Sequence, residues 1–458
     1  MQQAGDNLIK MANTYLYRDA TSSTSVTKAT ISCWFKRGNI GSEQHIWFSG
    51  NTSDYGQYSF RINFNADNTL RCMNDDEGTN FKYETNRKFR DTTGYYHICL
   101  TLDQTNGTAA DRAKLWINGV RETSFSTQTN MSGDQFFTGK SGYRQVIGRH
   151  EGGADGYLDG VLSHYYYIDG TAYDADTFGE TDATTGEWKI KTSPTVTMGT
   201  NGFAVLKDGN TYTDQSSNSN DLTLGGGSVT KTEDCPSNLF ASFNPLNYWN
   251  HNGTLRIPLY SNANWTANFD NASYNEIAFG NLGVKTGKYY WEVKATSVTN
   301  NSANTRIGVG DIQYTNTDPQ GTTATVYYQG NGAKRVSGSE TSYGGDTYTT
   351  GDVIGVALDM DNRKIYFAKN GTWQDSGDPT SGSTGTGAIS LPTGDFIYTI
   401  QCEDYASSGN RTMDLNTGNG YFGTTAISSE GTNASGIGKF EYDVPTGYTS
   451  LSTKGFNE

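Results

Sequence analysis

The 458-residue sequence contains little cysteine and little proline. Its cysteines are odd in number and form no C-x-x-C pair, so the sequence predicts neither a disulfide framework nor a zinc site. Two of them, Cys33 and Cys72, fall on the apolar side of alternating segments and are expected to act as small hydrophobic residues. The full set is Cys33, Cys72, Cys99, Cys235 and Cys402.

Positive charge and long apolar runs are also scarce. Lys and Arg number 34 against 48 Asp and Glu, for a formal net charge of −14, which argues against a nucleic acid partner. No apolar run approaches the ~18 residues of a membrane span, and residues 1–20 lack the apolar core of a signal peptide. We expect synthesis in a reducing cytoplasm, no membrane insertion and no export signal.

Glycine and aromatic residues are abundant, with 55 Gly, 30 Tyr and 20 Phe. Aromatic and β-branched residues suit strands, while Gly and Asn supply turns. Residues 28–37 place Ala29, Ile31, Cys33 and Phe35 on one face, and alternation recurs over 58–64 and 96–103. Asn118-Gly119 is a strong hairpin signal. The sequence predicts an all-β protein.

The segments YYHICLTLD (95–103), KLWINGVRE (114–122), VIGRH (146–150) and the stretch 157–180 occur in an order that resembles a laminin G-like, concanavalin A-like jelly roll. The resemblance covers roughly residues 8–190. It implies a first domain over residues 1–192.

A second set of strands, GKYYWEVK (287–294), RIGVGD (306–311) and the stretch 351–373, resembles the SPRY domain. The family's usual glycine is replaced by Arg363. The resemblance implies two tandem antiparallel β-sandwiches, the second over residues 240–458, joined by a short ordered connector over residues 193–239.

The segment DMDN (359–362) resembles the start of a calcium loop. A calcium loop of the EF-hand type would need a ligand at its fifth position, where Arg363 stands, and glycine at its sixth, where Lys364 stands. The flanking residues alternate as strands. We therefore expect a hairpin corner.

The connector carries a polar knot with the spacing of Asx-turns, formed by Asp214, Ser216, Asn218, Asn220 and Asp221. This pattern, followed by DCPSNLFASFNP (234–245), resembles a connector of tailed-phage virion proteins, and residues 440–456 resemble their closing segment. The resemblance implies a virion surface protein whose partners are other virion proteins, copies of itself and host surface glycans.

Catalysis has little support. The E-x-D-x-x-E strand signature of laminarinase-type hydrolases is absent. Glu441 and Asp443 lack a third partner, and Glu403 and Asp404 should point to opposite faces. None of the five histidines accompanies a G-x-S-x-G elbow. We expect no enzyme, and flexible loops at the glycine runs 225–228 and 381–387.

One loop is a candidate calcium site, and no other cofactor is indicated. Asp103, Asn106 and Asp111 lie on a loop at the expected sandwich edge, where some laminin G-like domains bind calcium. The alternative is a solvated loop held by Asx-turns. The same alternatives apply to Glu151, Asp155 and Asp159.

Aromatic residues near turns form a candidate sugar site, because a sugar needs a flat apolar ring beside hydrogen-bonding groups. The candidates are Tyr248, Trp249, His251, Trp265 and Tyr343. The alternative is that Trp249 and Trp265 fill the end of a sandwich. Residues 165–167, three tyrosines, are expected to alternate between the core and a partner subunit.

These observations favour a non-enzymatic phage virion surface protein, either a tail fibre, a tail-associated appendage or a capsid decoration, that adheres to host glycans. Two alternatives stay open: a structural decoration or cement protein without glycan binding, and a polysaccharide-degrading enzyme. A cellular SPRY adaptor is disfavoured because no cellular partner module accompanies it.

Overall fold

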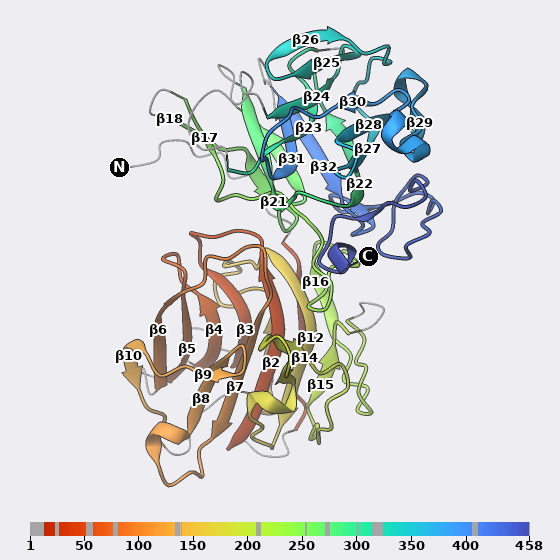
Figure 1. Cartoon of the computed structure of the whole chain (residues 1–458). Helices are drawn as coiled ribbons and strands as arrows, with labels where there is room; N and C mark the ends of the chain where they lie inside the picture. Colours follow the sequence, from red (N-terminus) through yellow and green to blue (C-terminus); the bar gives the residue numbers. More distant parts are fainter. Residues whose placement is uncertain are drawn as a thin grey trace. The chain divides into compact units, whose positions relative to one another are not determined.

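The computed structural model describes residues 13–22, 27–51, 58–76, 81–132, 138, 140–207, 212–251, 254–270, 275–299, 302–313, 324–404 and 411–457. Strands dominate the chain, which confirms the all-β prediction (Figure 1). It divides into two compact units between Lys231 and Thr232. Among the described residues, no helix has the length and apolar character needed to span a bilayer.

The first unit contains two antiparallel sheets. The order in one sheet is β10 (Phe125–Thr129), β6 (Phe81–Lys88), β5 (Thr69–Asp76), β4 (Tyr58–Phe64), β3 (Gln44–Asn51), β11 (Tyr143–Ile147), β1 (Tyr15–Asp19) and β16 (Thr223–Gly226). The order in the other is β15 (Phe203–Val205), β12 (Gly160–Asp169), β2 (Lys28–Arg37), β7 (Tyr96–Asp103), β8 (Ala113–Ile117) and β9 (Val120–Arg121). Short elements are η1 (Ala109–Asp111), η2 (Ala175–Thr177), β13 (Gly179–Thr181) and β14 (Trp188–Ile190).

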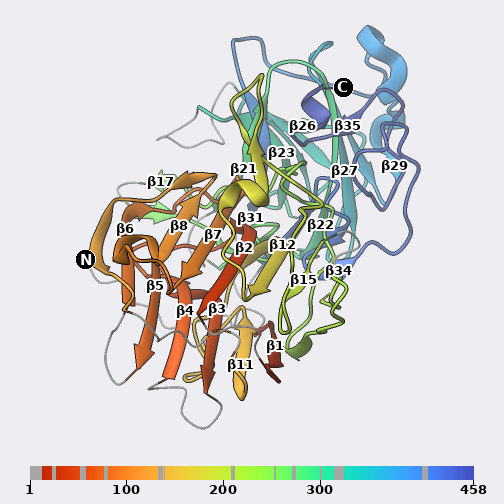
Figure 2. The ribbon, with the colours of Figure 1, turned by 90° about the horizontal axis from the view of Figure 1, so that it is seen from below.

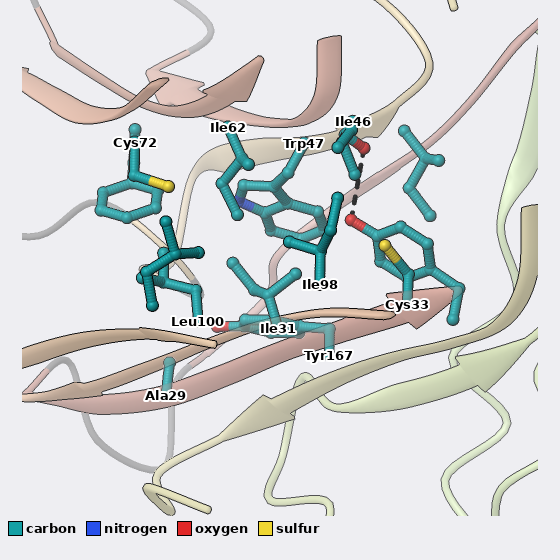
Figure 3. Packing of buried hydrophobic residues seen from close by; sticks show 14 of the residues in the cluster. Ala29, Ile31, Cys33, Ile46, Trp47, Ile62, Cys72, Ile98, Leu100 and Tyr167 are labelled. Carbon is teal, nitrogen blue, oxygen red and sulfur yellow. Dashed lines mark hydrogen bonds between the residues drawn. The ribbon is translucent and has the colours of Figure 1, made fainter. Parts of the chain in front are cut away.

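The core of the first unit lies between these sheets (Figure 3). Alternation along β2 brings Ala29, Ile31, Cys33 and Phe35 into it, as predicted. The ring of Trp47 on β3 stacks on Tyr167 of β12, with centroids 5.1 Å apart. The buried thiols of Cys33 and Cys72 contribute to this core, and burial raises the pKa of Cys72 to about 12. Both thiols are therefore packing groups.

The opposite face of the second sheet is covered by residues 170–198 of the same unit. Tyr166 and Ile168 of β12 pack there against Ala175 and Phe178. Tyr165 and Tyr167 point into the main core instead. The expectation that these tyrosines face a partner subunit is wrong, because both faces of β12 are covered from within the unit.

Residues 193–231 belong to the first unit, which differs from the expected connector of 193–239. Strand β15 pairs with β12, and β16 pairs with β1, so both strands extend the two sheets of the unit. Residues 225–226 lie in β16 and are not part of a flexible loop. A Cβ on Gly225 would stand 2.0 Å from the Tyr15 ring, so glycine leaves the room that this ring occupies.

The polar knot within this segment is formed as predicted. The Asp214 carboxylate accepts hydrogen bonds from the backbone N–H groups of Ala204, Ser216 and Asn220, at 2.9, 2.9 and 2.8 Å, and from the Ser216 hydroxyl at 2.8 Å. The bond to the Ser216 N–H is an Asx-turn. Asn218 donates to the carbonyl oxygens of Gly199 and Gly202. The knot ties residues 214–220 to residues 199–204.

The second unit also contains two sheets. The order in one is β19 (Leu259–Ser261), β20 (Thr266–Phe269), β32 (Arg411–Asn416), β22 (Lys288–Ser297), β27 (Val353–Asp359), β28 (Lys364–Lys369) and β29 (Thr372–Trp373), with β30 (Ile389–Ser390) on β28 and β35 (Thr449–Ser450) parallel to β22. The order in the other is β21 (Glu276–Val284), β31 (Tyr398–Asp404), β23 (Arg306–Asp311), β24 (Thr325–Gln329), β25 (Ala333–Val336) and β26 (Ser339–Ser342).

Short elements complete the second unit. They are the hairpins β17 (Trp249–His251) with β18 (Thr254–Arg256) and β33 (Tyr421–Phe422) with β34 (Thr425–Ala426), and the turns η4 (Gln374–Ser376), η5 (Pro379–Thr384) and η6 (Gly455–Asn457). Since η5 takes up residues 381–384, the expectation of a flexible loop over 381–387 is wrong for these residues.

The DMDN segment is the corner of the β27–β28 hairpin, as predicted, with Asp359 paired to Lys364. The Asp359 carboxylate accepts from the backbone and side chain of Asn362 and pairs with Lys288 at 3.0 Å. Arg363 adopts a φ of +56°, the left-handed conformation for which the family's glycine is suited. The side chain of Arg363 donates to the carbonyl oxygen of Pro392, which holds the corner.

Candidate functional site

The aromatic residues proposed for sugar binding do not form one exposed surface. Trp265 is only 5% exposed, and its Nε1–H donates to the Ala241 carbonyl at 3.0 Å. Tyr343 is 2% exposed and donates to the Gly387 carbonyl at 3.2 Å. The expectation of exposed rings is therefore wrong for these two residues, because each fills space within the second unit and satisfies its polar group there.

The other three candidates lie near β17. Tyr248 is exposed at 40%. Trp249 and His251 lie within β17, but their side chains are outside the part that the structure describes. Tyr248 is thus the one candidate of the set for which an exposed ring is shown.

The candidate calcium ligands all contact protein groups. Asp103 pairs with Lys28 at 3.1 Å and accepts from the Thr105 hydroxyl at 2.6 Å. Asn106 accepts from the backbone N–H of Thr108, and Asp111 pairs with Arg121 at 2.7 Å. These are the contacts of the alternative, a loop held by Asx-turns. Within the described residues, no group of three or more His, Cys, Asp or Glu side chains is arranged to hold a metal ion.

The second acidic segment is also engaged in protein contacts. Glu151 pairs with Arg149 at 2.5 Å, and the Asp155 carboxylate lies 3.2 Å from the Nδ1 atom of His150. The Asp159 carbonyl accepts from the backbone N–H of Gly38.

The carboxylates weighed for catalysis serve structural contacts. Glu441 accepts from Ser428, and Asp443 accepts from Thr432. Glu403 is buried and pairs with Arg306 at 2.6 Å. Each of these carboxylates therefore has a hydrogen-bonding or ionic partner within the fold.

A serine and a histidine meet in the first unit, at a spacing of 2.9 Å between Ser32 Oγ and His97 Nε2. The other ring nitrogen of His97 accepts the indole N–H of Trp188. An indole nitrogen can only donate, so Nε2 carries the proton and donates it to Ser32. A protonated Nε2 cannot take the serine proton, and this pair is not a nucleophile with its base.

A cluster of rings and guanidinium groups lies on the face of the β1–β11–β3 sheet that points away from the core. Figure 2 shows these strands side by side. Tyr15 and Tyr17 alternate with the core residue Leu16 along β1, so both rings share the outer face. The two rings stack with centroids 6.0 Å apart, and Tyr157 packs against Tyr15 at 6.4 Å. All three rings are half-buried, which leaves part of each in contact with solvent.

Two arginines lie over these rings. The Arg149 guanidinium is 3.5 Å from the Tyr15 ring centroid, and that of Arg144 is 4.5 Å from the Tyr17 ring centroid. Both arginines pair with Glu151, whose side chain is 6% exposed, at 2.5 and 3.1 Å. We call Tyr15, Tyr17, Tyr157, Arg144, Arg149 and Glu151 the ring–arginine cluster.

The sheet register assembles the ring–arginine cluster. Asp19 pairs opposite Arg144 across β1 and β11, and Arg144 also makes an ion pair with Asp19 at 2.8 Å. Because Glu151 and Asp19 fix the guanidinium groups, the cluster presents flat rings bordered by fixed donors and acceptors. Flat rings beside hydrogen-bonding groups are general features of sugar-binding sites. The alternation in YLYRD (15–19) indicates that Tyr15 and Tyr17 share one face of a strand. Sequence reasoning missed the cluster because the arginines that cover these rings lie about 130 residues further along the chain.

The two units match different family models. Residues 10–169 match the model of the concanavalin A-like lectin/glucanases superfamily, and residues 288–387 match the SPRY domain. The chain holds a laminin G-like domain followed by a SPRY domain. The ring–arginine cluster lies in the laminin G-like domain, and Tyr248 lies in the unit that holds the SPRY domain.

Solved structures include similar chains. The SPRY domain of human HERC1 is 18% identical, with coverage of 38% of this chain and 96% of that domain and a TM-score of 0.31. A SAP-like pentraxin from Limulus polyphemus is 17% identical, with coverage of 36% and 72% and a TM-score of 0.27. The PSpry domain of TRIM65 is 14% identical, with coverage of 38% and 91% and a TM-score of 0.27. No curated protein matches the sequence significantly.

Proposed function

We propose that the protein is a non-enzymatic surface protein of a tailed-phage particle, a tail fibre, tail-associated appendage or capsid decoration, that attaches to host glycans. The observation that carries the proposal is the order of a laminin G-like domain and a SPRY domain, with the Asp214 knot between them in sequence. Its partners on the particle are other virion proteins and further copies of itself.

The ring–arginine cluster supports the glycan part of the proposal. Tyr17 offers a half-buried ring, and the Arg144 guanidinium lies over one face of it. A single shallow sugar site of this kind binds with a Kd on the order of millimolar, about −4 kcal/mol. Many copies on one particle raise the avidity by roughly 10²–10⁴, so weak sites suffice for attachment.

The position of the protein on the particle is the first test. An antibody against residues 240–456 is applied to purified, intact virions and viewed by electron microscopy. Label at the tail supports a fibre or appendage, and label over the head supports a decoration. Particles without label at either place contradict the virion assignment.

A glycan array tests the binding part with three proteins. We expect the wild type to bind, Tyr17→Ala to lose about tenfold in affinity because stacking is removed, and Tyr248→Ala to bind as the wild type does. Loss in Tyr248→Ala alone would place the site in the second unit instead. An array on which the wild type binds no glycan contradicts the glycan proposal.

One observation favours the structural alternative. Leu246, Tyr248 and Leu259 are large apolar or aromatic side chains that stay exposed in the second unit, at 40–49%. Such residues suit contact with another virion subunit. A decoration protein without glycan affinity would give label over the head and an empty array.

A further inference from the structure

Two histidines stack next to the ring–arginine cluster. His45 on β3 is 1% exposed, and its ring lies 5.1 Å from that of His150, which directly follows Arg149. The Phe48 ring packs edge-on against the His150 ring, with centroids 5.1 Å apart. Backbone bonds from His150 to the Asp155 carbonyl and from His45 to the Gly156 carbonyl, both 2.9 Å, hold residues 150–156 over β3. We call this segment the 150–156 loop.

His45 has one fixed protonation state. Its Nε2 lies 3.0 Å from a Glu43 oxygen that Arg71 also contacts at 3.0 Å. An ionised carboxylate can only accept, so Nε2 carries the hydrogen. Within the described residues, the buried Nδ1 of His45 has no hydrogen-bond partner, and a second proton there would have no acceptor. His45 is neutral, and burial lowers its pKa.

His150 has two incompatible partners on one nitrogen. The backbone N–H of Gly153 donates to Nδ1 over 3.2 Å, which requires Nδ1 to be bare. The Asp155 carboxylate lies 3.2 Å from the same Nδ1, which requires Nδ1 to carry a proton. Nδ1 accepts from Gly153 when the single proton of the neutral ring is on Nε2, and it donates to Asp155 when Nδ1 carries a proton, as it always does in the protonated ring. Protonation of the ring therefore excludes the hydrogen bond from Gly153.

The surrounding charges set the balance between these two states. Burial and Arg61 on β4 lower the pKa of His150, while Asp155 on the same loop and Glu43 before β3 raise it. The stacked His45 ring is neutral and adds no charge. The net effect lowers the pKa, so the ring is neutral and able to accept from Gly153 at neutral pH, and in acid it is protonated and donates to Asp155.

We propose that His150 is a proton-operated latch of the 150–156 loop, exchanging its bond to Gly153 for one to Asp155 on acidification. Arg149 and Glu151 flank His150 in the chain and form the core of the ring–arginine cluster. The latch therefore acts on a residue that lies between two members of the cluster in the chain. Its effect on glycan attachment rests on the proposed function, but the latch itself does not.

Hydrogen exchange of the full-length protein tests the latch. The exchange of peptides within 150–157 is measured at about pH 7.5 and about pH 5 for wild type and His150→Phe, whose ring keeps the stack but cannot be protonated. Intrinsic exchange cancels in the ratio of the two proteins. We expect the exchange rate of the wild type divided by that of the variant to be about fivefold higher at about pH 5 than at about pH 7.5. The reason is that protonation of His150 removes the hydrogen bond of the Gly153 N–H in the wild type only. A ratio that does not change with pH overturns the proposal.

A second measurement does not depend on how well His150→Phe folds. Histidine-selective labelling gives one NMR signal for each of the five histidines. Asp155 is exposed, so Asp155→Asn leaves the fold intact while it removes the negative charge that favours the protonated ring. We expect this variant to lower the pKa of His150, and an unchanged pKa contradicts the latch. Glycan binding is assayed separately at both pH values, so an empty array with a working latch refutes the proposed function alone.

Discussion

The indole Nε1–H of Trp188 donates to Nδ1 of His97 over 3.1 Å and thereby fixes the neutral form of a fully buried histidine. Trp34 stacks on the opposite side of the imidazole, with centroids 4.9 Å apart. A second proton on the ring would face the indole N–H, which cannot accept it. The hydrogen bond therefore links β14, which carries Trp188, to β7, which carries His97, and it forms only while His97 is neutral.

Acid should destabilise the laminin G-like domain through His97. Burial lowers the pKa of this residue from 6.5 to about 3 in the folded chain. Between these values the unfolded chain binds more protons, so stability is full above about pH 6.5 and is lost as the pH falls toward 3. At about pH 4.5 we expect a loss of about 2–3 kcal/mol, measured by denaturant unfolding across pH.

The control for this pH effect is His97→Gln, which cannot titrate in that range. We expect a flatter dependence of unfolding free energy on pH in the variant, whatever its absolute stability. Equal slopes for the two proteins would show that His97 does not contribute.

The hairpin turn at Asn118-Gly119 should tolerate no side chain at its second position. Gly119 has a φ of +76°, and a Cβ there would stand 2.4 Å from the Trp188 ring. We expect Gly119→Ala to cost about 2 kcal/mol or more in unfolding free energy. Gly186→Ala is the matched control, because Gly186 has a φ of +75° and a Cβ at that position meets nothing within 4 Å. Equal effects of the two substitutions would refute the steric reason.

The Asp214 knot should contribute strongly to the stability of the first unit. Asp214→Ala leaves three backbone N–H donors and one hydroxyl without their acceptor, which we expect to cost about 3 kcal/mol or more. Thermal unfolding measures the loss. Asp176 is exposed, so Asp176→Ala should change stability by less than about 0.5 kcal/mol. A small effect at Asp214 would mean that the knot does not hold these segments together.

The carboxylate of Glu292 should control the docking of residues 440–443. It accepts from the backbone N–H groups of Glu441 and Tyr442 at 2.9 and 2.8 Å, and from Asn416 at 3.1 Å. Glu292→Gln puts an amide N–H against one of these donors, so we expect about tenfold faster hydrogen exchange at 441–442. Glu441→Gln is the control, because its side chain contacts Ser428 only at the surface. Similar exchange in both variants would exclude a docking role for Glu292.

Local patterns predicted much of the fold because they depend on near neighbours. The two-residue period placed Ala29 and Phe35 in the core, and Asn118-Gly119 formed the expected turn. The DMDN corner followed from the same local reasoning, since Lys364 could not serve as the turn glycine of a calcium loop.

Long-range packing decided what the sequence could not predict. Trp265 lies in a polar stretch that suggests exposure, but Ala241 accepts its indole N–H and the ring is buried. Tyr15 and Arg149 meet because β1 pairs with β11, a pairing that no local pattern announces. Residues 193–231 joined the first unit for the same reason, since β15 and β16 found partners far along the chain.

The parallel pairing of β35 with β22 has a consequence for how the chain is made. Tyr289 on β22 pairs with Thr449, so about 160 residues must leave the ribosome after Tyr289 before its partner exists. At roughly 5–20 residues per second this interval is on the order of ten to thirty seconds. Throughout it, Tyr289 and Tyr290 of β22 lack this partner in the nascent chain, and chains on neighbouring ribosomes expose the same two-residue edge. Slow translation and crowded polysomes should therefore favour aggregation at this point, which gives molecular chaperones a specific window in which to act.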